Sequence, residues 1–126
     1  ELVLIVTAAY LVDQSEPEFR KSESFRVWQD WMKKYLPAAD PNDQLNLYGY
    51  ATAAALVHIL EACGDDLTRE NVMKVAANLK DVDIPMLVPG IRLNTSPTDF
   101  SPIAEMKLAK FDGKRWVLFG ELLSGR

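Results

Sequence analysis

The chain opens with a run of hydrophobic positions. Ten of the eleven residues from Leu2 to Val12 are apolar, and Thr7 is the exception. A continuous run of this length, rich in Val, Ile and Leu, is typical of a strand buried on both faces, as strands of parallel sheets are. It is shorter than the ~18 apolar residues that a membrane span needs. We therefore predict a buried strand, which requires neighbouring strands on both sides.

The next apolar positions recur at helical spacing. Residues 14–24 are polar and predict a connection. In residues 23–37, Phe25, Trp28 and Met32 fall on one face of a helix, and Pro37 is its stop signal. The pattern predicts an amphipathic helix with a buried aromatic face.

Two further helices are expected in the middle of the chain. Residues 45–64 are apolar on nearly every side, with Asp43 as a candidate N-cap and Gly64 as the C-terminal stop. Residues 67–79 carry a hydrophobic stripe at helical spacing, with Thr68 as the cap. The middle helix would need other elements around most of its surface.

The C-terminal part changes to the pattern of strands. Residues 91–94 predict a short strand. Residues 104–120 predict a β-hairpin, because two apolar or alternating runs flank Asp112 and Gly113, a dipeptide that suits a type I′ turn. The expected order is a strand, three helices, a short strand and a hairpin in one domain spanning residues 1–126. This order is typical of an α/β or α+β layout, and a buried opening strand favours α/β.

Composition and charge narrow the function. The chain has 126 residues, 48% of them hydrophobic, and a net charge of −4, with no basic stripe for a nucleic acid. Cys63 is the one cysteine and has no partner for a disulfide or a metal site. His58, the one histidine, has no nucleophile at a useful spacing, so we expect it to serve the surface or helix packing. We expect neither an enzyme nor a cofactor.

Aromatic residues are the better candidates for a site. Tyr10 lies toward the C-terminal end of the opening strand, and ligands of open α/β sheets bind outside the carboxyl ends of strands. Tyr48 and Tyr50 lie near the start of the apolar helix, beside Leu45. They line a ligand cleft in one interpretation and belong to the core in the other.

The ordered series of segments resembles a known family. "VTAAYLVD", "YGYATAAALVHIL", "LTRENVMKVAANLK", Gly90 before a strand and "FDGKRW" follow one another as in the C-terminal third of periplasmic substrate-binding proteins of ABC transporters, of the branched-chain amino acid (Leu/Ile/Val-binding) type. The resemblance covers essentially the whole chain. It rests on the order and spacing of the series, because no single motif is diagnostic.

The resemblance implies a fragment of a two-lobed type I periplasmic binding protein fold. The chain would contribute to both lobes and to the hinge, and the sheet partners of the opening strand would lie upstream. The family has an aromatic residue that packs on the ligand at the position of Leu45. Leucine there leaves the solute open among amino acids and aromatic or organic acids.

The function expected from this resemblance is solute capture by lobe closure in the periplasm and delivery to the transporter permease. Tyr10, Leu45 and Tyr48 are the expected ligand-binding residues, with no metal and no catalytic residue. The alternatives are a ligand-sensing regulatory domain of the same fold and a small stand-alone enzyme. An open edge at Leu2–Val12 and the apolar helix also predict a homodimer or larger oligomer that binds ligand poorly by itself.

Overall fold

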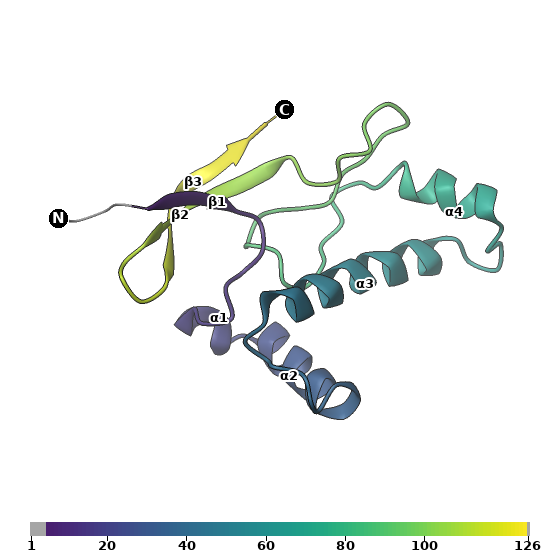
Figure 1. Cartoon of the computed structure of the whole chain (residues 1–126). Coiled ribbons are helices and arrows are strands. Elements are labelled where there is room, and N and C mark those ends of the chain that lie inside the picture. The colour runs from purple at the N-terminus through teal and green to yellow at the C-terminus, as the bar shows by residue number, and fades with distance from the viewer. Residues whose placement is uncertain (1–4, 126) are drawn as a thin grey trace.

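A computed structural model describes residues 5–125 of the chain (Figure 1). Within these residues it contains four helices and one three-stranded antiparallel sheet, so the prediction of a mixed helix-and-sheet layout is confirmed at that coarse level. In chain order the elements are β1 (Val6–Ala9), α1 (Pro17–Arg20), α2 (Glu23–Tyr35), α3 (Gln44–Ala62), α4 (Arg69–Ala76), β2 (Glu105–Phe111) and β3 (Trp116–Ser124).

The opening strand differs from the prediction. β1 is an edge strand that pairs antiparallel with β2, from Val6 opposite Lys110 to Ala9 opposite Lys107, and most of its residues are exposed. Within the described residues, no strand pairs with its other edge. The predicted buried, parallel strand is therefore wrong for residues 6–9, because among the described residues they pair only with the hairpin, and antiparallel to it. Residues 2–4 of the apolar run lie outside the described residues.

The hairpin is confirmed, but its turn is not the predicted one. Phe111 pairs with Trp116, so the loop has four residues and not the two of a type I′ turn. The Asp112 carboxylate accepts hydrogen bonds from the backbone N–H groups of Lys114 at 2.9 Å and Arg115 at 3.0 Å. These bonds close a wider loop around Gly113, whose φ is +97°.

The three predicted helices are present and start where their caps indicate. Ser22 accepts a hydrogen bond from the Phe25 N–H, Asp43 from Leu45, and Thr68 from Asn71. The chain after α3 reaches Gly64 with a φ of +60°, the left-handed conformation that commonly ends a helix.

The helix α1 was missed because residues 14–24 are polar. Pro17 occupies its first turn, where the missing N–H costs nothing, and the Glu16 carboxylate accepts a hydrogen bond from the Phe19 N–H at 2.6 Å. A capping residue followed by proline is a local signal for a helix start, so this short helix was within reach of the sequence.

Residues 91–94 were predicted as a strand and form only an isolated bridge. The backbone groups of Val82 and Leu93 exchange two hydrogen bonds, of 3.1 and 2.9 Å. Ile91 and Leu93 are buried all the same. These side chains belong to the hydrophobic core, although residues 79–95 form an irregular segment. Pro85 and Pro89 interrupt regular strand pairing in this segment.

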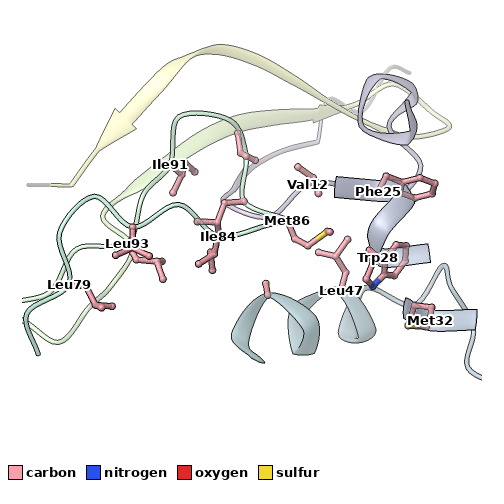
Figure 2. Packing of buried hydrophobic residues seen from close by; sticks show 14 residues of the cluster. Val12, Phe25, Trp28, Met32, Leu47, Leu79, Ile84, Met86, Ile91 and Leu93 are labelled. Atoms are coloured by element: carbon pink, nitrogen blue, oxygen red, sulfur yellow. The ribbon is translucent and has the colours of Figure 1, made fainter. Parts of the chain in front are cut away.

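The hydrophobic core lies between α2, α3 and this irregular segment (Figure 2). Trp28, Leu47 and Ile91 are completely buried. The sheet covers the other side of the irregular segment, through Leu118 and Leu122 (Figures 1 and 2). The Trp28 indole N–H, although buried, has no hydrogen-bond partner among the described residues. None of the helices within residues 5–125 combines the length and the hydropathy that a membrane span requires.

Candidate ligand-binding groove

An open groove of about 580 Å³ lies between the start of α3, the end of β1 and the irregular segments on either side of residue 95. Three aromatic side chains line it, those of Tyr10, Tyr48 and Phe100, together with Met106. The remaining lining is aliphatic or proline, apart from the hydroxyl residues Thr52 and Ser101. We call this the Tyr10–Tyr48 groove.

Backbone hydrogen bonds fix Tyr10 on the first wall. The Tyr10 carbonyl accepts a hydrogen bond from the Val88 N–H at 2.8 Å, and the Val12 N–H donates to the Met86 carbonyl at 3.0 Å. The chain that leaves β1 is therefore attached to the irregular segment immediately after the strand ends. Met86, whose carbonyl accepts the Val12 hydrogen bond, has a φ of +76°, which is uncommon for a residue with a side chain.

The second wall is the N-terminal half of α3, which carries Tyr48. Two side-chain hydrogen bonds join the start of this helix to the chain that follows Tyr10. The Gln44 side-chain amide donates to the Val12 carbonyl at 3.1 Å, and the Gln14 side-chain amide donates to the Asp43 carbonyl at 3.1 Å. These bonds span about thirty residues of sequence and hold the two tyrosine-bearing walls in one arrangement.

Phe100, on the connection into β2, and Met106, in β2 itself, form the third wall. The Pro102 carbonyl accepts a hydrogen bond from the Asn94 N–H at 2.9 Å, and the Asp99 carboxylate accepts one from the Ser101 N–H at 3.0 Å. These bonds order a loop that contains two prolines. Phe100 remains 67% exposed, so this wall offers an aromatic surface to solvent.

The groove has no charge of its own. None of its described lining residues is an acid, a lysine, an arginine or a histidine. The lining hydroxyls are those of tyrosine, serine and threonine, and the Thr52 hydroxyl donates to the Tyr48 carbonyl at 2.9 Å. This chemistry suits contact with an apolar or aromatic molecule.

Two of the three residues expected from the sequence line this groove. Tyr10 and Tyr48 come together there from different elements. Leu45 lies one turn before Tyr48 on α3, outside the groove lining, and is 73% exposed. A ligand-binding role for all three residues stays a prediction.

Phe100 and Met106 were missed as candidates. They lie in and after a polar, proline-containing stretch, and nothing local indicates that it returns to the start of α3. Their place in the groove depends on how the irregular segments pack.

The other cavities carry weaker chemistry. A cavity of about 400 Å³ beside the sheet is lined by Asp13, Glu16 and Glu18. These carboxylates already accept hydrogen bonds from Ser15, Phe19 and Lys21 respectively. They therefore serve the local structure around α1.

The one histidine and the one cysteine were the remaining candidates for chemistry; His58 lines a cavity of about 490 Å³ with Lys74 and Lys80. His58 is exposed on α3, and Cys63 is buried at the end of that helix, as predicted for each. In the part of the chain that the structure describes, no group of three or more His, Cys, Asp or Glu side chains is placed to hold a metal ion. No family model, no curated protein and no solved structure matches this chain in the comparisons made.

Proposed function

We propose that this chain is part of the periplasmic solute-binding component of an ABC transporter, with the Tyr10–Tyr48 groove as its side of the ligand cleft. The observation that carries the proposal is the convergence of Tyr10 and Tyr48 on one groove of about 580 Å³. That volume lies in the range of about 300 to 1,000 Å³ typical of small-molecule sites. The ordered series of segments described from the sequence supports the same function.

The groove is open to solvent beyond its three walls, which fits a site that a second lobe would cover. Tyr48 is 49% exposed, so part of its surface packs against the protein and part is free to contact a bound molecule. In the proposed two-lobed type I binding fold, hinge closure would bring the other lobe over this surface. The captured solute would then be delivered to the membrane permease.

Binding suits this lining better than catalysis. A general acid or base near neutral pH is most often a histidine, a carboxylate or a lysine. The described lining residues include none of these. The proposed role therefore needs only shape, aromatic contact and a few hydroxyl groups.

Alanine variants test the assignment of the groove. In a protein that contains both lobes, Tyr48→Ala is expected to weaken solute binding by about 1 kcal/mol or more, the scale of a buried aromatic contact. Tyr10→Ala should act in the same direction. Titration calorimetry with the tightest solute from a panel of amino acids and organic acids gives the affinity.

Tyr35→Ala is the matched control, because Tyr35 is an exposed tyrosine on α2 outside the groove. Its affinity should equal that of the wild type. Unchanged affinity in Tyr10→Ala, Leu45→Ala and Tyr48→Ala would remove all three residues from the site. A panel in which no solute binds would contradict the proposed function itself.

A further inference from the structure

The wall chemistry of the groove restricts what can be bound there. Aromatic surface reaches it from the end of β1 as Tyr10, from α3 as Tyr48 and from the connection into β2 as Phe100. Met106 adds a thioether, which packs well against ring edges. Rings placed on three different elements can contact a planar molecule on its faces and its edge, which are the favoured geometries of aromatic pairs.

The same lining gives no oppositely charged partner to an ion. A carboxylate or an ammonium group that loses water on binding must regain a charged or hydrogen-bonding partner, or its desolvation opposes binding. No described lining residue carries a formal charge. Asp99 lies next to this wall, but its carboxylate accepts the Ser101 N–H and does not line the groove.

The groove still offers neutral hydrogen-bonding groups. Among the described residues, no protein hydrogen bond uses the hydroxyl of Tyr10 or Tyr48. A phenolic hydroxyl donates one hydrogen bond and accepts others, so it can serve a neutral polar substituent of either kind. The combination favours an uncharged ring that bears a hydroxyl-type group.

We propose that the Tyr10–Tyr48 groove binds an uncharged aromatic molecule and discriminates against carboxylate and ammonium analogues of the same ring. This inference rests on the proposed function, because it names the class of solute for that same site. It differs from the expectation of an amino acid, since a zwitterion would bring two charges to a lining that carries no opposite charge for either.

The test uses three probes of similar size and different charge at pH 7: benzyl alcohol, benzoate and benzylamine. They are titrated into the full chain, and backbone amide signals are followed by NMR, which detects millimolar binding. Benzyl alcohol is expected to shift the signals of Tyr48, Thr52 and Phe100. Its affinity should exceed that of either charged probe by about tenfold, the effect of one unsatisfied polar group.

Charge-reversal variants at Thr52 give a sharper readout than alanine. Thr52 is exposed on α3 and lines the groove, and lysine and glutamate are good helix formers, so the fold should persist. Thr52→Lys should make benzoate the preferred probe, and Thr52→Glu should make benzylamine preferred. Circular dichroism of both variants serves as the folding control, and their helix content should equal that of the wild type.

The outcomes separate this inference from the proposed function. Benzoate or benzylamine binding as tightly as benzyl alcohol at the groove signals would overturn the ligand class and leave solute binding intact. Preferences unchanged in Thr52→Lys and Thr52→Glu would also overturn it. If none of the three probes shifts the groove signals, the ligand class fails, whereas the proposed function is decided by the solute panel in the protein that contains both lobes.

Discussion

Gly113 lies in the hairpin loop with a φ of +97°, a conformation that side-chain-bearing residues rarely adopt. A Cβ at this position would meet nothing within 4 Å, so any cost of substitution comes from the backbone. Gly113→Val is expected to lower the free energy of unfolding by about 1 kcal/mol or more. Thermal melting measures the effect.

Gly49 supplies the matched comparison. It lies inside α3, and a Cβ there would also meet nothing within 4 Å. Because alanine favours a helix over glycine, Gly49→Ala should raise the free energy of unfolding by about 0.5–1 kcal/mol. A melting temperature unmoved by Gly113→Val would mean that the loop accepts another conformation.

The Asp112 carboxylate couples the same loop to pH. Hydrogen bonds from the backbone N–H groups of Arg115 and Lys114 hold the pKa of Asp112 below its usual value of 3.8. A lowered folded-state pKa contributes stability that is present above the unfolded value and is lost as pH falls through the folded value. Urea unfolding between pH 5 and pH 2 should therefore show a smaller loss of stability in Asp112→Asn than in the wild type.

The control for that measurement is Asp65→Asn, at an exposed carboxylate that accepts no hydrogen bond from the residues that the structure describes. Its stability should follow the wild-type pH profile. An Asp112→Asn profile that is parallel to the wild type would show that the loop bonds do not persist in solution.

At the scale of elements, Thr95 joins the end of α4 to the irregular segment. Its buried hydroxyl accepts a hydrogen bond from the Leu79 N–H at 2.8 Å and donates to the Ala76 carbonyl at 2.7 Å. Thr95→Val keeps the shape and leaves both backbone groups without this partner, so it should cost about 1–3 kcal/mol. Denaturant unfolding measures the loss. Thr98→Val, at an exposed site, should stay within about 0.5 kcal/mol of the wild type.

Helices were predictable here because their signals are local. Ser22, Asp43 and Thr68 each cap the helix that follows within three residues, and the apolar spacing of α2 matches the residues it buries. A helix of this kind depends on its own sequence for its hydrogen bonds. Its start can therefore be assigned without knowing the rest of the fold.

Strand partners were not predictable because they are set by distant parts of the chain. The apolar residues of β1 indicate a strand, but nothing in them specifies an antiparallel neighbour that begins at Glu105. Residues 91–94 are apolar for burial in an irregular segment and not for pairing. Hydrophobicity alone does not distinguish a buried irregular segment from a paired strand.

The groove residues also divide into those with a local sequence signal and those placed by distant contacts. Tyr10 and Tyr48 could be singled out because each lies near the end of a recognisable element. Phe100 and Met106 could not, because their approach depends on the Asn94–Pro102 hydrogen bond and its surroundings. Leu45 was placed by family resemblance, and one turn of helix separates it from Tyr48.

At the scale of the whole molecule, α3 leaves an apolar face uncovered. Leu45, Leu56, Val57 and Leu60 are all exposed along this helix, and the outer edge of β1 is unpaired in the described structure. Exposed apolar faces and open strand edges both favour association. We expect the chain to form a dimer or larger species whose population rises with concentration, measured by sedimentation at micromolar protein.

A charge on α3 should reverse this behaviour. Leu56→Glu places a carboxylate in the middle of the exposed face and is expected to shift the population toward monomer. Val27→Glu makes the same change at an exposed apolar position of α2 and should have less effect. A wild-type chain that sediments as a 14.2 kDa monomer at every concentration would contradict the prediction.

The buried, unpartnered indole of Trp28 gives the molecule a built-in optical reporter. An excited indole emits at longer wavelength when water or polar groups reorient around it. Trp28 is completely buried and its N–H has no hydrogen-bond partner within residues 5–125, so this relaxation is restricted. Trp31 and Trp116 are partly exposed and should emit further to the red. Subtracting the spectrum of Trp28→Phe from that of the wild type would isolate the blue component. Its red shift would then follow any separation of α2 from α3 without an added label.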